Sequence, residues 1–600
     1  MSLSSVVVWW QDWQLRILVL SSLFFQCILY FSSWLRKSPN LRRLRLLVWI
    51  AYIGGDAVAI YALATLFNRH KQTWDGGNSA LEVLWTPVLL IHLGGQPWIT
   101  SYSLEDNELW KRHTITLVSQ VTVALYVFCK WWSGKKMLLA AAILLFVLGI
   151  IRFAQKPWAL RVASFNTMQA SITVSPPAAQ KEAGCISLEE YVQAAKKCAL
   201  ETKECLGATF NFLYTKVGSV VSNLGVGLML LLPFLAFVST VLFATSHKDG
   251  HNEKDIKVTY ILLSCTTVLE FWFPCILICS PCWRSIDKFY SRGWHDMVSQ
   301  HNLISFCVRK KKPTFMMKLA TFNFLRDFIN QHWYIQHVPT AFQVKGVVRK
   351  HMKNGWKKYI CDAASYRRFS EFRGQWALRR NHQLGWSLKK PFDESVLIWH
   401  VATDLCFYHP DRPLQGIQEE ATQRSKEISN YMIYLLLIRP DMLMTGTRSD
   451  IFTTASVEIM KNTKGPFDTE EMLAREILSM PMRPIATTIV SDACNLTKAL
   501  MELADEKERW TVIQGVWVEM LCYSASRCRG YLHAKSLGEG GEYLSTVWLL
   551  WSFMGMETLA DKIQSPEPPQ EEGDKEEEAA ASTSDSQSRT GQSEVNFSLV

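Results

Sequence analysis

The sequence predicts an all-α protein, with a polytopic membrane domain of about seven spans, a mainly helical cytosolic domain and a disordered acidic tail. Three observations lead to this class. Mostly apolar stretches of about 20 residues, the length that crosses a bilayer as a helix, recur in the first half of the chain. In the second half, apolar residues recur at spacings of three and four, which is typical of amphipathic helices. The last segment is rich in Pro, Glu and Ser and poor in apolar residues.

The apolar stretches define seven candidate spans. They lie at about 17–35, 46–67, 81–99, 114–132, 137–153, 223–245 and 257–280. The third is the weakest, because Pro87, His92 and the pair Gly94 and Gly95 interrupt it. A buried soluble helix is the alternative for any single stretch. Seven of them together predict a multi-pass integral membrane protein of the plasma membrane or an endomembrane.

Lys and Arg residues indicate the orientation, because they gather in the cytosolic loops of membrane proteins. They are dense between the first two spans and after the last one. With seven spans, this distribution places the N-terminus outside and the C-terminus in the cytosol.

Composition divides the chain into four segments. We expect a transmembrane domain at 1–283 with a cytosolic loop at about 154–222, a basic juxtamembrane segment at 284–392, a helical cytosolic domain at 393–562 and a disordered acidic tail at 563–600.

The basic segment carries most of the positive charge of the chain. Between Arg284 and Lys390 there are 22 Lys and Arg residues and five Asp and Glu residues, interleaved with aromatic side chains. Directly beneath a membrane span, anionic lipid headgroups are favoured over nucleic acid as the partner. The run from Arg309 through Lys310 and Lys311 to Lys312 is the candidate contact. A solvated basic face is the alternative.

A cysteine cluster follows the last span. Cys275, Cys279 and Cys282 lack a fourth ligand nearby in the sequence, which argues against zinc. Palmitoylation of Cys279 or Cys282 is the more favoured modification at this membrane boundary.

Two pairs of ionisable residues are candidates for chemistry. His400 and Asp404 lie four apart and so share a helical face, where they would act as an oriented base or as two metal ligands. A histidine held structurally by a neighbouring carboxylate or carbonyl is the favoured interpretation. Asp56 and His92 lie within or beside predicted spans, where ionisable groups often mark substrate or proton routes.

The motif search finds no phosphate-binding loop, dinucleotide fingerprint, zinc-protease motif or nucleophile elbow. We therefore predict no cofactor. The favoured function is a non-enzymatic scaffold or signalling protein whose cytosolic helical domain binds unidentified cytosolic protein partners. A membrane transporter or channel, or a membrane-bound enzyme, is the alternative.

Several long strings carry a family resemblance. LLIHLGGQPWITSYSLEDNELWKRH at 89–113 resembles the plant membrane proteins of domain of unknown function 4220. IWHVATDLCFY at 398–408, ISNYMIYLLLIRPDML at 428–443 and WVEMLCYSASRCRGYLHAKSLGEGGEYLSTVWLL at 517–550 resemble the C-terminal domain of unknown function 594 that accompanies it. The resemblance implies a plant membrane protein with a paired cytosolic domain. It does not imply any particular activity, because the family has none assigned. Members of the first family usually carry an Asp-Thr pair where this sequence has Pro97 and Trp98, which casts doubt on an ion or proton role that needs that acid.

Overall fold

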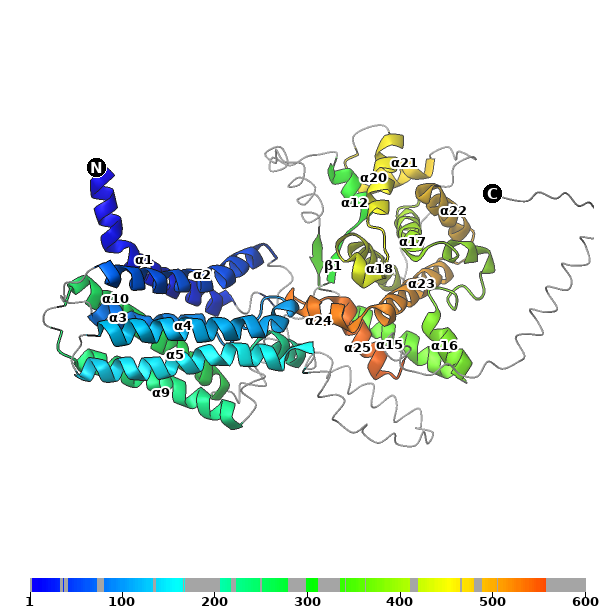
Figure 1. Cartoon of the computed structure of the whole chain (residues 1–600). Helices are drawn as coiled ribbons and strands as arrows, with labels where there is room; N and C mark the ends of the chain where they lie inside the picture. The colour runs from blue at the N-terminus through cyan, green and yellow to red at the C-terminus, as the bar shows by residue number, and fades with distance from the viewer. Residues whose placement is uncertain are drawn as a thin grey trace, which may run out of the picture. The chain divides into compact units, whose positions relative to one another are not determined.

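A computed structural model gives the fold (Figure 1). It describes residues 3–32, 36, 42–72, 80–132, 136–165, 167, 206–216, 223–248, 251–278, 298–310, 335–339, 341–361, 363–410, 419–463, 467–479, 488–503 and 505–556. The predicted tail at 563–600 lies outside these residues. Helices make up nearly all of the regular structure in the described part, in agreement with the predicted class.

Six described helices belong to segments that are long and apolar enough to cross a membrane. They are α1 (Leu3–Ser32), α2 (Arg42–Gln72), α4 (Trp110–Trp131), α5 (Lys136–Val162), α9 (Asn223–Thr245) and α10 (Glu253–Ile278). A helix suits these sequences because it satisfies every backbone donor and acceptor internally, as a lipid environment requires. The six helices pack together with α3 into a bundle (Figure 1).

The outer surface of the bundle is apolar. Phe24, Ile115 and Phe234 are 62%, 71% and 61% exposed, and many other large apolar side chains of these helices are exposed as well. Such a surface is rare on a protein surrounded by water. It fits helices that face lipid.

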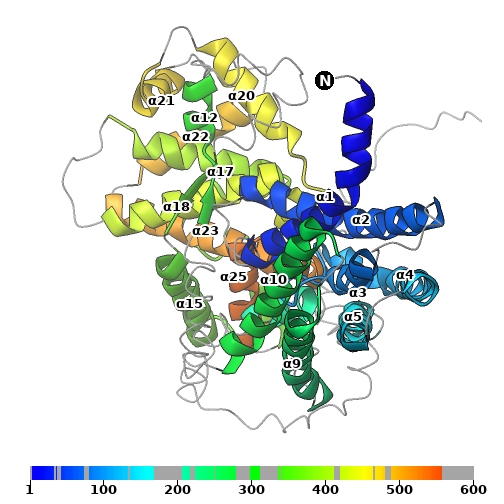
Figure 2. The same cartoon turned by 90° about the vertical axis from the view of Figure 1, so that its left-hand side faces the viewer.

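The third expected span differs from the other six. Helix α3 (Ala80–Leu93) has 14 residues and so rises about 21 Å, less than the roughly 30 Å of a bilayer core. It lies inside the bundle against α1, α2, α4, α5 and α10 (Figure 2), and its residues from Leu81 onward are buried. Gly95 has a φ of 64°, which glycine adopts readily, and the backbone beyond it is non-helical as far as the 3₁₀ helix η3 (Leu104–Leu109).

The number of crossings decides whether the two ends of the chain lie on one side of the membrane. The described residues contain six candidate spans, and the third expected span is represented by the shorter helix α3, so the side of each terminus stays a prediction.

A second group of helices follows the bundle. It contains two short antiparallel strands, β1 (Val298–Gln300) and β2 (Gln336–Val338), in which Ser299 pairs with His337. The helices are α12 (Leu303–Lys310), α15 (Ala341–Lys358), α16 (Ala363–Glu371), η4 (His382–Leu388), α17 (Phe392–Phe407), α18 (Glu419–Ile438), α19 (Pro440–Leu443), α20 (Asp450–Asn462), α21 (Glu470–Ser479), α22 (Ile489–Met501), α23 (Glu506–Arg527), α24 (Gly530–Gly538) and α25 (Tyr543–Phe553). We call residues 298–556 the helical domain.

Helix α17 is the centre of the helical domain. Nearly all of its residues are buried, and it packs against α18 and α22. Trp517 of α23 donates its indole N–H to the Thr403 hydroxyl at 3.0 Å, so the large buried ring also has its polar atom satisfied. Val298 and Leu303, which lie in the predicted basic segment, belong to the same apolar core as Trp399 of α17.

A buried carboxyl group fixes the loop after α16. The two Glu519 oxygens accept the backbone N–H groups of Gly374, Trp376 and Ala377 at 2.8, 3.2 and 2.7 Å. Burial raises the pKa of Glu519 to about 8. One side chain of α23 therefore satisfies three backbone donors.

Replacing this side chain tests its structural role. Glu519→Ala leaves three buried donors without partners, so we expect the free energy of unfolding to fall by about 3 kcal/mol or more. Thermal or chemical unfolding of the detergent-purified chain measures the change. Glu508→Ala, at an exposed position of the same helix, should change the free energy by less than about 0.5 kcal/mol. Equal effects of the two substitutions would contradict this account.

Candidate functional site

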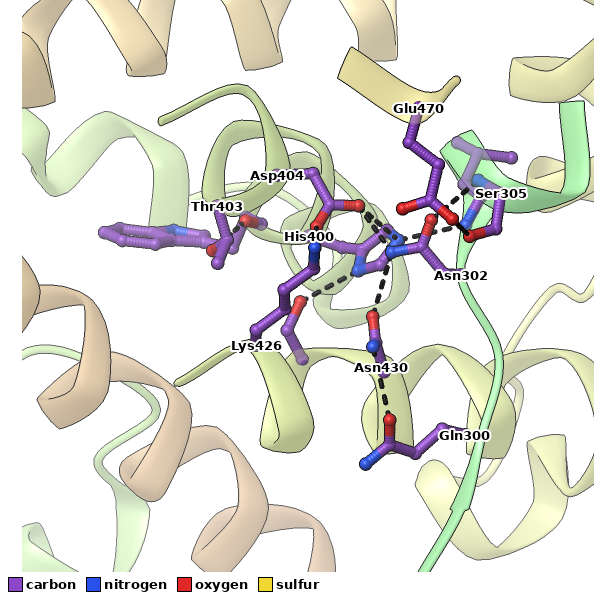
Figure 3. Close-up of polar contacts among 12 residues, drawn as sticks. Gln300, Asn302, Ser305, His400, Thr403, Asp404, Lys426, Asn430 and Glu470 are labelled. Atoms are coloured by element: carbon purple, nitrogen blue, oxygen red, sulfur yellow. Dashed lines mark hydrogen bonds and ion pairs between the residues drawn. The ribbon is translucent and has the colours of Figure 1, made fainter. Parts of the chain in front are cut away.

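The candidate site lies where α12, α17 and α18 meet in the helical domain (Figure 3). The sequence placed His400 and Asp404 on one face of a helix, and in α17 the His400 Nε2 atom lies 3.7 Å from Asp404 Oδ2. Pro391 precedes the helix, and Asp393 in its first turn suits the positive end of the helix dipole.

His400 has both of its ring nitrogens engaged. Nε2 accepts the backbone N–H of Leu303 at 3.2 Å, so the ring proton lies on Nδ1, which faces the Ser429 hydroxyl at 2.8 Å. Burial lowers the pKa of His400 to about 3. The ring is therefore neutral and ties α17 to α12 and α18, with no nitrogen left to act as a base.

Asp404 begins a chain of polar contacts. Its Oδ2 accepts the Asn302 amide at 2.5 Å, and the same amide nitrogen donates to Asn430 Oδ1 at 3.0 Å. Asn430 Nδ2 donates in turn to Gln300 Oε1 at 3.3 Å. The side-chain oxygen Oδ1 of Asn302 accepts the backbone N–H of Ser305 at 2.8 Å, so this residue also holds the start of α12.

A cavity of about 230 Å³ lies beside this chain of amides. Its walls are formed by Gln300, His301, Asn302, Ser305, Phe306, Arg309, Gln336, Val338, Gln423, Lys426, Glu427, Asn430 and Glu470. Two cations and two carboxylates are among them, so the formal charges of the described lining residues balance. Most of the other lining residues offer hydrogen-bond donors or acceptors.

Two charged residues of the lining are held in place by neighbours. Lys426 donates to the Tyr408 hydroxyl at 2.9 Å and lies 3.9 Å from the centre of the Phe407 ring. Glu470 accepts hydrogen bonds from that same hydroxyl at 2.6 Å and from Ser305. The Tyr408 hydroxyl thus contacts both a cation and an anion.

His301 is the least satisfied residue of the lining. Its side chain is 1% exposed, and neither ring nitrogen has a hydrogen-bond partner among the described residues. The ring packs edge-on against Phe452 at 5.1 Å between centres. Burial lowers the pKa of His301 to about 3, so the neutral ring offers one donor and one acceptor. Gln300 Nε2 also lacks a partner in the described part of the chain.

The other predicted residues lie elsewhere. His92 is at the end of α3 and Asp56 in α2, so neither joins this site. Arg309, proposed as a lipid contact, is exposed and lines the cavity; Cys279, Cys282, the Lys310 side chain, Lys311 and Lys312 lie outside the described residues. Among the described residues, no group of three or more His, Cys, Asp or Glu side chains is placed to hold a metal ion.

Comparison with known proteins gives two matches. Residues 49–205 and 202–328 match a domain of unknown function, DUF4220, and residues 502–556 match a protein of unknown function, DUF594. The chain belongs to the DUF4220–DUF594 family. The DUF4220 match runs from α2 into the start of the helical domain and includes His301 and Asn302, whereas Lys426 and Asn430 lie between the two matches. No curated protein and no solved structure matches the chain.

The pH dependence of stability tests the position of Asp404. Burial raises the pKa of Asp404 to about 6, above the roughly 3.9 of an unfolded chain. The folded state then binds this proton more tightly, so the stability that Asp404 contributes is present below about pH 4 and is lost as the pH rises to about 6. Asp404→Asn has no carboxyl group to titrate, so it should lack this decrease in stability with rising pH.

Unfolding measured from pH 4 to pH 7 should show that the wild type loses about 2 to 3 kcal/mol more than Asp404→Asn. Asp441→Asn, at an exposed carboxyl, should keep the wild-type pH dependence. Parallel curves for the wild type and Asp404→Asn would rule out the raised pKa.

Proposed function

We propose that the DUF4220–DUF594 chain is a non-enzymatic membrane protein whose helical domain binds a small polar molecule in the cavity beside Asn302 and Asn430. The observation that carries this proposal is His301, which lines a polar cavity and whose two buried ring nitrogens have no partner in the described structure. A buried polar atom without a partner costs about 1 to 3 kcal/mol. A bound ligand, or water that the ligand displaces, offsets that cost.

The charges of the cavity narrow the class of ligand. Arg309 and Lys426 balance Glu427 and Glu470, which favours a neutral or zwitterionic molecule over an ion of a single sign. The amides of the lining add donors and acceptors side by side. A free amino acid carries such a combination of charges and hydrogen-bonding groups.

Binding is favoured over catalysis by the state of the two histidines. His400 uses both nitrogens for structural hydrogen bonds, and His301 has a pKa too low for an effective base near neutral pH. This supports the interpretation of His400 and Asp404 as structural residues.

We also propose that the helical domain faces the cytosol of a plasma membrane or endomembrane. The density of Lys and Arg residues after the last span supports this orientation. Occupancy of the cavity would then report a cytosolic metabolite to protein partners of the domain.

A single substitution tests ligand binding. His301→Phe keeps an aromatic ring against Phe306 and Phe452 but removes both nitrogens. Since it also removes two unpaired polar atoms, we expect the unliganded variant to be as stable as the wild type or up to about 3 kcal/mol more stable. His301→Phe should no longer bind the ligand.

The measurement is thermal unfolding of the detergent-purified full chain with millimolar zwitterionic amino acids, with glycerol and acetate as uncharged and anionic comparisons. At least one amino acid should stabilise the wild type and not His301→Phe. His382→Phe, the same change at an exposed histidine of the domain, should respond like the wild type. No stabilisation of the wild type by any probe, or equal stabilisation of His301→Phe, would overturn the proposal.

A further inference from the structure

A second, smaller cavity leads to a site that is independent of the one in the helical domain. It lies in the membrane bundle where α9 packs against α5 and α10 (Figure 1), and we call it the bundle cavity. Its volume is about 20 Å³, which holds one water molecule or an ion of similar size. Each of the three helices contributes residues to the lining, together with Pro97 and Lys216. A ligand of this cavity must therefore be small.

The bundle cavity is close to one face of the membrane. Gly225 begins the α9 span, Pro274 precedes the last residue of the α10 span, and Trp158 lies about one turn before the end of the α5 span. All three residues line the cavity, so it lies where the three spans reach the same face. Trp158 is partly exposed, as is common for tryptophan at the boundary between lipid and water. An ion from the water on this side has a short path to the cavity.

The lining of the bundle cavity is positively charged. Arg152 and Lys216 are cations and Glu270 is the carboxylate among the described lining residues, so their formal charges sum to one positive charge. All three side chains are buried, with Arg152 5% and Lys216 2% exposed. Gly225, in the first turn of α9, adds the positive end of a helix dipole. A buried excess of charge is costly unless a counter-ion balances it.

The Arg152 guanidinium is incompletely satisfied within the described structure. Its Nε atom lies 3.1 Å from Glu270 Oε1 but is buried without a hydrogen-bond partner among the described residues. Its Nη1 atom donates to Gln155 Oε1 at 3.2 Å. A negative charge in the cavity would compensate this cation better than Glu270 does alone.

The segment after α3 holds Lys216 beside Arg152. The Lys216 ammonium donates to the Gly94 carbonyl at 2.6 Å, and its backbone N–H donates to the Pro97 carbonyl at 2.8 Å. A Cβ atom at Gly94 would lie 2.8 Å from the Arg152 carbonyl oxygen, so glycine lets this segment pack directly against α5. Both cations of the lining are thus fixed in advance, which lowers the cost of binding a ligand.

The pKa of Lys216 reports the charge of its surroundings. Burial lowers this pKa well below its usual range, and the positive charges of Arg152 and Lys156 lower it further. The carboxylates of Glu270 and Asp56 act in the opposite direction but offset the shift only in part. A bound anion would stabilise the charged ammonium.

We propose that the bundle cavity binds a single monovalent anion of the size of chloride. One negative charge neutralises the lining, and the cavity volume excludes larger anions. Leu232 and Phe273 complete the wall, and a halide, which has no hydrogen-bond donor to satisfy, tolerates such apolar neighbours. The bound ion would stabilise the contact of α5, α9 and α10 at this end of the bundle.

The test is thermal unfolding of the detergent-purified full chain in sodium chloride and in sodium gluconate at equal ionic strength. Gluconate is too large for the cavity, so only chloride should raise the unfolding midpoint of the wild type, and the rise should grow with chloride concentration. Lys216→Gln should lose this response. Glu270→Gln makes the lining more positive, so it should respond to chloride at lower concentrations than the wild type.

The control is Lys257→Gln, the same change at an exposed lysine of α10, which should respond to chloride like the wild type. Equal midpoints of the wild type in chloride and gluconate would refute the anion site. So would a full chloride response in folded Lys216→Gln, or a response of Glu270→Gln weaker than that of the wild type. The comparison of wild type and Glu270→Gln decides the question even if Lys216→Gln does not fold.

Discussion

A polar group that leaves water needs a hydrogen-bond partner, and this requirement shapes both halves of the described chain. In the membrane bundle, buried cations meet carboxylates, as Lys156 meets Asp56 at 2.6 Å. In the helical domain, Glu519 receives three backbone donors and His400 links three helices. These contacts define the register in which the helices pack, which apolar surfaces alone would not specify.

The same requirement makes the exceptions informative. His301 and His92 are both buried, both retain unpaired ring nitrogens and both lie among other polar groups. His400, by contrast, has both of its ring nitrogens engaged in hydrogen bonds. The contrast distinguishes a histidine that links three helices from buried histidines with ring nitrogens that are not used by the fold.

Some of this was predictable from the sequence. Six spans follow directly from long apolar runs, and the spacing of His400 and Asp404 correctly placed them on one helical face. The third run was already the weakest in the sequence, and its helix has only 14 residues: α3 continues through Pro87 and ends at Leu93, before Gly94 and Gly95. The cavity was not predictable, since His301, Asn302, Lys426 and Asn430 come from separate segments and form no periodic pattern.

The residues that line the cavity come partly from the DUF4220 match and partly from the segment between the two family matches. His301 and Asn302 fall within the DUF4220 match, while Lys426 and Asn430 fall outside both matches. A gene fusion that joined another sequence after the DUF4220 match, which ends at residue 328, would separate the two walls. The cavity therefore depends on the helical domain as a whole and not on the DUF4220 region alone.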